Sequence, residues 1–71
     1  MKPDYLVKMA NQIEGFFRSE PDREVAIESI RGHIERFWDP RMRHAILAHV
    51  ASGGAGLGEL AMHAVKRLAA K

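Results

Sequence analysis

Helix-breaking residues divide the sequence into segments, and this division limits the folds open to the chain. Breaks fall at Ser19–Asp22, at the pair Asp39-Pro40 and in the glycine-rich run Ser52–Gly58. Between the breaks, apolar residues recur with the period of an α-helix, and no stretch alternates cleanly with β-branched residues as a half-buried strand would. We therefore predict an all-α fold, a small bundle of about four helices. The predicted helices cover about residues 4–18, 20–38, 40–51 and 58–70.

The first two predicted helices each carry one apolar face. At about 100° per residue, the large apolar side chains of each helix share an arc of about 100°. They are Leu6, Met9, Ile13, Phe16 and Phe17 in the first helix, and Ile27, Ile30, Ile34, Phe37 and Trp38 in the second. Outside the first arc lie Lys8, Asn11, Glu14 and Arg18. We expect Phe37 to lie in the core, whereas the pattern leaves Trp38 open between core and surface.

The third and fourth helices differ in how their apolar residues are spread. Apolar surface wraps most of the third helix, which therefore needs neighbours on more than one side. Its apolar residues are Met42, Ala45, Ile46, Leu47 and Val50, and those of the fourth helix, on one face, are Leu57, Leu60, Ala61, Ala64, Val65 and Leu68. Because ordered glycine costs backbone entropy, we expect residues 52–58 to form a flexible linker within a single helical domain, residues 1–71.

Acidic residues and prolines mark the expected starts of the helices. Asp4 is the predicted N-cap of the first helix, and Ser19–Asp22 resembles a capping box at the start of the second. Asp39 is the predicted N-cap of the third helix, with Pro40 in its first position. The second and third helices should therefore meet at an elbow with almost no loop.

The residues that carry most enzyme and metal chemistry are missing or badly spaced. There is no cysteine for thiolate catalysis, iron–sulfur clusters or a disulfide. The four histidines, His33, His44, His49 and His63, include no pair at helical ligand spacing. The glycine run follows no strand and lacks the Gly-Lys-Ser/Thr ending of a phosphate-binding loop. We predict no catalytic, cofactor-binding or metal site in this chain.

Positive charge concentrates around the elbow, where three arginines flank a tryptophan. Arginine and tryptophan are enriched at the hot spots of protein interfaces, so we predict a partner-binding surface here. Its predicted residues are Arg36, Trp38, Arg41, Met42, Arg43 and, on the apolar side of the third helix, His49. For His49 we favour a neutral, hydrogen-bonded histidine in a helix or subunit contact over a ligand or proton carrier. The charged ladder of the second helix, with Arg31 four residues before Glu35, is expected to be a solvated face.

Length and charge leave several partners open. The net charge of +2 is too small to select a partner by its overall field. Two alternatives to a subunit contact are a small helical nucleic-acid-binding module and a freestanding homodimer. Since no apolar run reaches the roughly 20 residues that span a bilayer, we expect no membrane contact and a cytoplasmic location.

The residues of the elbow also carry a resemblance. Met9–Ile13 (MANQI) with Phe16-Phe17, then His33–Arg43 (HIERFWDPRMR), then Gly56-Leu57 before the last helix, resemble the delta subunit of cytoplasmic NAD-dependent formate dehydrogenases. The likeness covers nearly the whole chain, and the Phe-Trp-Asp-Pro-Arg-Met run is its most specific part. One departure is Gly58 at the cap of the fourth helix, where the family leads us to expect serine.

The resemblance implies a non-catalytic accessory subunit of an enzyme that converts formate and NAD to carbon dioxide and NADH. It implies that molybdopterin with molybdenum or tungsten, iron–sulfur clusters and FMN belong to the other subunits, and that the partner is the catalytic alpha subunit. The role would be assembly, stability or maturation of the cofactor-loaded complex. No nucleic acid is implied, and a homodimer of the isolated chain stays an alternative.

Overall fold

A computed structural model describes residues 2–69 of the chain. Its helices are α1 (Pro3–Phe17), α2 (Arg23–Phe37), α3 (Pro40–Ala51) and α4 (Glu59–Ala69), and these residues contain no strand. The predicted all-α class and the four helices are confirmed.

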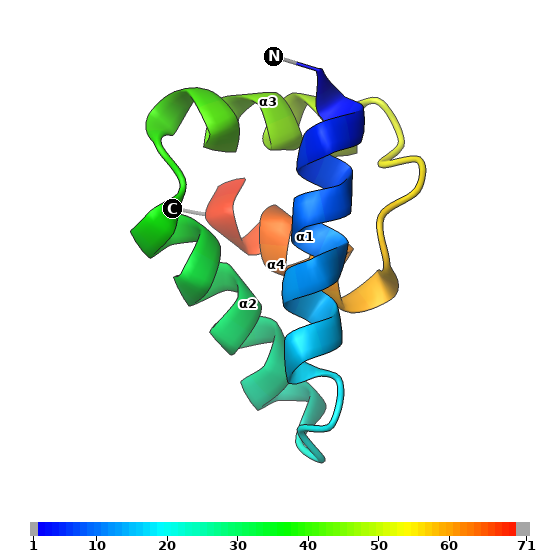
Figure 1. Ribbon diagram of the computed structural model, residues 1–71, viewed down its shortest axis with the longest axis vertical. Coiled ribbons are helices and arrows are strands. Elements are labelled where there is room, and N and C mark those ends of the chain that lie inside the picture. The colour runs from blue at the N-terminus through cyan, green and yellow to red at the C-terminus, as the bar shows by residue number, and fades with distance from the viewer. Residues whose placement is uncertain (1, 70–71) are drawn as a thin grey trace.

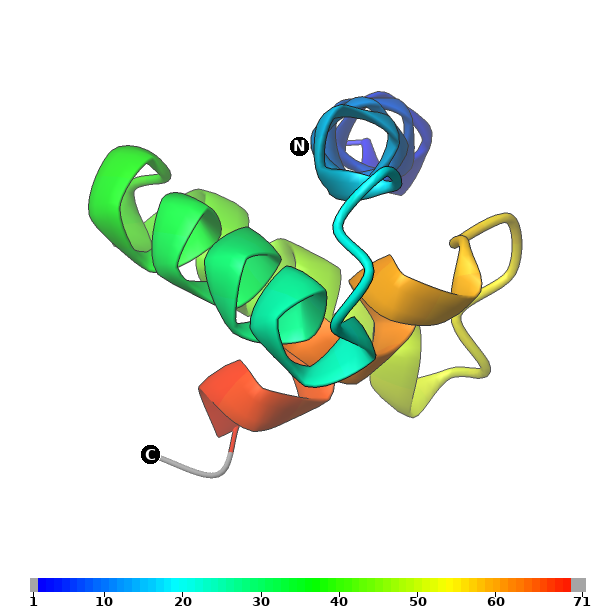
Figure 2. The ribbon, with the colours of Figure 1, turned by 90° about the horizontal axis from the view of Figure 1, so that it is seen from below.

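The helices pack around one core in a body of about 32 × 23 × 19 Å. α1 and α2 are joined by a short turn at one end and diverge toward the other, where α3 crosses near the start of α1 (Figure 1). α4 lies behind both of them and packs chiefly against α2 (Figures 1 and 2). Every helix therefore contributes to the same interior.

Branched aliphatic side chains and alanines fill the interior, together with the indole of Trp38. The buried apolar residues are Leu6, Ala10, Ala26, Ile27, Ile30, Ile34, Trp38, Ile46, Ala61, Ala64 and Val65. The alanines let α4 approach its neighbours closely, as its sequence predicted. The buried face of α1 is turned from the predicted arc toward Ala10 and Glu14, because α4 packs on that side.

This rotation leaves one predicted core residue outside. Phe16 is 81% exposed, and its ring meets only the edge of Phe17, with ring centroids 5.3 Å apart. Glu14, which lies outside the predicted apolar arc, is buried instead. The apolar period within α1 does not predict which side of that helix α4, distant in sequence, will cover.

At the end of α2 the expected placement of Phe37 is wrong. Phe37 is 67% exposed and stacks on the ring of His33, with centroids 4.7 Å apart, whereas Trp38 is only 4% exposed. Trp38 is the C-cap and has an extended backbone (φ −89°, ψ 140°), so helical periodicity no longer sets the direction of its side chain. The indole turns into the core and Phe37 stays on the outside of the last turn.

The predicted N-cap residue is confirmed for α3, whereas α1 and α2 begin at other residues than predicted. Asp39 accepts a hydrogen bond from the Met42 amide at 2.9 Å, which confirms it as the N-cap of α3. Asp4 is not a cap, because α1 already begins at Pro3, with Lys2 as its N-cap residue. α2 begins at Arg23 and is capped by Asp22, since a residue before proline is pushed out of the helical region, which keeps Glu20 outside the helix.

Asn11 and Glu14 of α1 hold the segment that leads into α4. The amide of Asn11 donates to the carbonyl of Gly56 at 2.9 Å, and its oxygen accepts from the backbone N–H of Gly58 at 2.8 Å. Glu14 accepts from the N–H of Ala61 at 2.7 Å, in the first turn of α4. The glycine run is thus bound to α1 by side-chain hydrogen bonds, although we predicted a flexible linker from its composition.

At the N-terminus of α4, the close approach of Glu14 requires glycine at position 58. A Cβ there would lie 2.5 Å from Oε1 of Glu14, so a serine would displace the carboxylate. Glu14 performs from α1 the capping that a side chain at position 58 would otherwise perform. Gly54 is constrained in a different way, because it combines a positive φ of 67° with close packing under Met62.

The neighbouring aromatic residues of the elbow provide a stability test. Trp38→Ala should cost about 3–5 kcal/mol, a large part of the roughly 5–15 kcal/mol that stabilises a small domain. Phe37→Ala removes an exposed ring and should cost less than about 1 kcal/mol. Urea unfolding followed by circular dichroism measures both. Equal losses for the two variants would contradict the burial of the indole.

A second test concerns the contact between α1 and the start of α4. Glu14→Ala removes a cap bond and should cost about 0.5–2 kcal/mol, with faster amide hydrogen exchange in residues 57–62. Glu14→Gln keeps an acceptor and should lose less. Lys8→Ala, an exposed change on the same helix, is the control. Uniform exchange across α4 in all three variants would contradict a local role for Glu14.

Candidate partner-binding surface at the helical elbow

Backbone hydrogen bonds and caps fix the elbow between α2 and α3. The Trp38 N–H donates to the carbonyl of Ile34 at 2.9 Å, which closes the last turn of α2. Pro40 then occupies the first position of α3, where its missing N–H costs nothing. The predicted elbow with almost no loop is confirmed, because only Trp38 and Asp39 separate the two helices.

Arg43 closes the elbow from the α3 side. Its Nη1 donates to the carbonyl of Glu35 at 3.2 Å and to the carbonyl of Trp38. These oxygens belong to the C-terminal end of α2, where helix geometry leaves carbonyls without partners and where positive charge is favourable. Arg43 therefore fixes the angle of the elbow through contacts within the chain.

The six residues predicted for this surface divide into three groups. Arg36 and Arg41 are exposed, and within residues 2–69 neither has a hydrogen bond or ion pair. Trp38 lies in the core, with Met42 half-buried against it and Arg43 half-buried at the carbonyls. The elbow therefore brings five of the six residues together, but only Arg36 and Arg41 offer free guanidinium groups.

His49 lies away from the elbow, in the last turn of α3. Its Nε2 is 2.8 Å from the carbonyl oxygen of Ala55, so the ring bonds to the glycine-rich loop. His49 therefore has the hydrogen-bonded role that was one interpretation of the sequence, another being a contact with a partner.

Sequence reasoning missed an aromatic part of the same surface. Phe37 lies beside Arg36 and stacks on His33, and Phe17 of α1 lines the same hollow as these residues. Phe16 lines a neighbouring groove with Phe17 and His33. The only sequence signal is the spacing of His33 and Phe37, four residues apart on one helix. We define the elbow surface as Arg36, Phe37 and Arg41.

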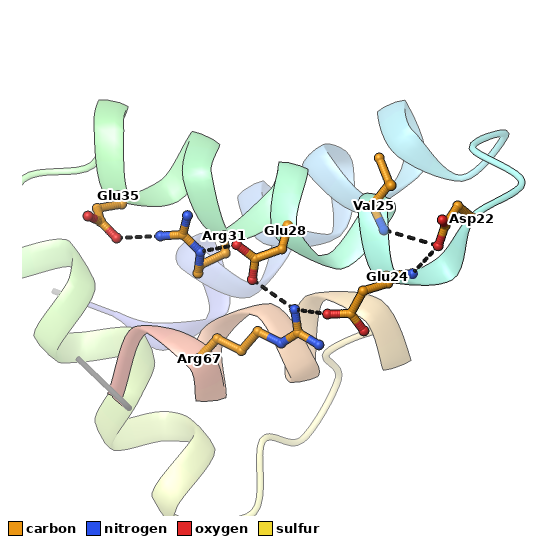
Figure 3. A network of polar contacts seen from close by, with 7 residues as sticks. All are labelled: Asp22, Glu24, Val25, Glu28, Arg31, Glu35 and Arg67. Atoms are coloured by element: carbon orange, nitrogen blue, oxygen red, sulfur yellow. Dashed lines mark hydrogen bonds and ion pairs between the residues drawn. The ribbon is translucent and has the colours of Figure 1, made fainter.

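The charged ladder of α2 belongs to a network of ion pairs that includes α4, so it is more than a solvated face (Figure 3). Arg67 of α4 lies 2.5 Å from Glu24 and 2.8 Å from Glu28. Arg31 bonds Glu28 at 2.9 Å and Glu35 at 2.5 Å, which confirms the expected pair at helical spacing. The two pairs of Arg67 join α2 to α4, whereas the pairs of Arg31 lie within α2.

The same network changes the ionisation of its members. Hydrogen bonds from Arg67 lower the pKa of Glu24 and of Glu28 below the ordinary value of 4.5, and Arg31 adds to the effect on Glu28. The two carboxylates in turn raise the pKa of Arg67. At the start of α4, the hydrogen bond from Arg23 lowers the pKa of Glu59.

Nearly all the negative charge is used inside the chain. Asp22 and Asp39 are caps, Glu14 binds α4, and Glu20 accepts from the Asp22 N–H at 3.2 Å. The other four glutamates belong to ion pairs with arginine. Of the nine acidic residues, only Asp4 has no such contact within residues 2–69. The elbow surface therefore carries positive charge that no acidic side chain in the described part of the chain neutralises.

Two further findings bear on partners. No helix in the described part of the chain is both long and apolar enough to cross a membrane. Among residues 2–69, no group of three or more histidine and acidic side chains is placed to hold a metal ion.

Together these observations define a small four-helix protein whose distinctive exposed chemistry is a rigid corner of arginine and aromatic side chains. The chain belongs to the NADH-dependent formate dehydrogenase delta subunit family, FdsD, because the family's model matches residues 5–65. The resemblance stated from the sequence is thereby confirmed, and the match contains the whole elbow. Searches of curated proteins and of solved structures returned no match.

The ion pairs of Arg67 predict a pH effect. Folding lowers the pKa values of Glu24 and Glu28 below 4.5, the ordinary value for glutamate. As the pH falls, these residues therefore bind protons in the unfolded chain before they do so in the folded one. The free energy of unfolding consequently decreases with the pH. Arg67→Met should lower the melting temperature at neutral pH and flatten its decline between about pH 5 and pH 3.

Melting curves by circular dichroism measure this decline, with Lys66→Met, the adjacent exposed cation of α4, as the control. A decline as steep in Arg67→Met as in the wild type would show that these pairs do not contribute to acid sensitivity.

Proposed function

We propose that this chain is a non-catalytic accessory subunit that binds a larger subunit of a formate dehydrogenase through its elbow surface. The observation that carries the proposal is a pair of guanidinium groups, Arg36 and Arg41, that have no partner within residues 2–69. They lie on either side of a bend that hydrogen bonds of Asp39 and Arg43 hold in place. Membership of the delta subunit family supports a place in that complex.

The rigid bend matters because binding energy is lost when flexible groups must be ordered. Asp39 and Arg43 hold the backbone of the elbow before any partner arrives. Arg36 and Arg41 then offer planar donors that match carboxylates or backbone carbonyls, and Phe37 adds exposed apolar area. The buried Trp38 packs in the core beside this surface and supports it.

The proposal assigns the redox chemistry to other subunits. Iron–sulfur clusters are held mainly by cysteine thiolates, and this chain has none. His49 is bonded to a backbone carbonyl and His33 stacks on Phe37, which is typical of structural histidines. The molybdopterin with molybdenum or tungsten, the iron–sulfur clusters and the FMN would then belong to the larger subunits, with the catalytic alpha subunit as the partner.

An accessory subunit of this kind acts through linkage. A protein that binds only one conformation of its partner stabilises that conformation by about 2.7 kcal/mol when present at 100 times its Kd. If the favoured conformation is the assembled, cofactor-loaded one, the delta subunit raises its population without taking part in the reaction. Since the reaction reduces NAD, we place the complex in the cytoplasm.

Charge reversal tests the surface. The double variant Arg36→Glu with Arg41→Glu should bind the complex about 10- to 100-fold more weakly, because it replaces two attractive contacts with repulsion. Affinity capture of the tagged chain from cells that produce all subunits measures retention. Lys66→Glu on α4 is the control, and circular dichroism checks that each variant stays helical. Full retention of the double variant would remove the elbow surface from the proposal.

Deletion tests the role itself. Without this chain, the remaining subunits should show lower molybdenum or tungsten content, or lose subunits during purification, with lower formate-dependent NAD reduction. The measurements are metal analysis, subunit stoichiometry and NADH formation on the purified complex. A complex of full composition, metal content and activity would contradict an accessory role.

A further inference from the structure

A groove of about 340 Å³ lies between α1 and the C-terminal part of α2. It is lined chiefly by apolar and aromatic side chains, namely Met9, Ile13, Phe16, Phe17, His33 and Trp38. The indole of Trp38 contributes to its lining from the elbow, so the groove and the elbow surface share a wall. Nothing within residues 2–69 fills it.

The groove exposes more aromatic surface than a chain of this size needs for folding. Phe16, on one rim, is 81% exposed, so its side chain does not contribute to the packing of the core. Phe17 and His33 also line the neighbouring hollow on the outer side of α2, which contains Arg36 and Phe37. A contiguous apolar surface with a polar rim is typical of a site that another protein covers.

The charges around the groove indicate the chemistry of its occupant. Arg36 lines the hollow next to it, together with Glu24, Glu28 and Arg31. Those three side chains are engaged in ion pairs with one another or with Arg67, whereas Arg36 has no partner within residues 2–69. The carboxylates closest in sequence, Glu35 and Asp39, are engaged with Arg31 and as the cap of α3. An occupant therefore gains most if it supplies both apolar side chains and a carboxylate.

The length of the groove fits a short helix. Met9 and Phe17 are eight residues apart on α1, a distance of about 12 Å at 1.5 Å per residue. Apolar anchors at positions i, i+3 or i+4, and i+7 of a second helix span about 10 Å. A groove between two helices accepts such anchors side by side, whereas an extended strand would find no sheet edge to pair with.

We propose that this groove binds an acidic amphipathic helix of a larger subunit, with apolar anchors in the groove and a carboxylate that pairs with Arg36. This inference rests on the proposed function and deepens it by naming the chemistry of the partner segment. Binding would cover Phe16 and Phe37 together and neutralise a charge that the chain leaves unpaired.

A second copy of the chain fits less well. A two-fold dimer places the same patch of both copies in contact, so the two grooves, each with Arg36 in the hollow beside it, would face each other. Only Asp4 retains an unengaged carboxylate within residues 2–69, and it lies at the start of α1 beyond Met9. The dimer would bury positive charge without compensation.

Photo-crosslinking in the assembled complex tests the occupant. The phenylalanine at position 16 is replaced by benzoylphenylalanine, the complex is irradiated, and mass spectrometry maps the linked segment. The expected product links position 16 to a helical segment of a larger subunit with apolar residues at helical spacing and an acidic residue within two turns. The same probe at Tyr5, an exposed aromatic of α1 outside the groove lining, is the matched control. Linkage of position 16 to a second copy, or to a segment without acidic residues, would overturn the proposal.

Affinity measurements separate the groove from the proposed function. Phe16→Ser should weaken retention in the complex about thirtyfold, as expected for a hot-spot residue, while Tyr5→Ser should not. Loss of helicity is not expected, because both side chains are exposed. If wild type and Phe16→Ser are retained equally, the groove proposal fails while the accessory role stands. If the wild-type chain does not co-purify with the complex at all, the proposed function fails with it.

Discussion

The bend at Trp38-Asp39-Pro40 is the constraint on which the rest of the structure depends. Proline cannot continue α2, Asp39 starts α3, and the extended backbone of Trp38 between them sends the indole into the core. The same turn leaves Phe37 on the outside beside Arg36 and uses Arg43 to cap the end of α2. One local break in helical geometry thus supplies both a core residue and the exposed surface that we assign to binding.

The start of α4 is held against α1 by polar contacts as well as by apolar packing. Asn11 and Glu14 bind three backbone N–H and carbonyl groups around the start of α4, and Glu14 is only 8% exposed. A buried carboxylate is expensive unless its oxygens are paired, so the position of α4 and the burial of Glu14 require each other. Gly58 makes room for this arrangement, which explains the departure from serine that the family resemblance brought to notice.

Local chemistry predicted the helices well, because proline, glycine and cap residues act over a few neighbours. The Asp39 cap, the elbow and the apolar face of α4 all followed from such signals. The burial of Trp38 and the exposure of Phe37 did not follow from such signals, because they depend on the backbone angles of Trp38, after the end of α2. Glu14 looked solvent-exposed for a related reason: its partner, the Ala61 N–H, is 47 residues away and comes from a helix whose position no short pattern reveals.

The distribution of charge links fold to binding. Arg67 and Arg31 neutralise the acidic ladder of α2, and Arg23 neutralises Glu59, so the ion pairs that join α2 to α4 also consume the negative charge of the chain. Exposed ion pairs of this kind contribute little stability each. Their larger consequence concerns Arg36 and Arg41. The acidic side chains nearest in sequence, Glu35 and Asp39, are already engaged, so within residues 2–69 neither arginine has an ion pair. A partner can therefore gain from both the apolar groove and the positive charge, whereas within residues 2–69 a second copy of this chain offers only the carboxylate of Asp4.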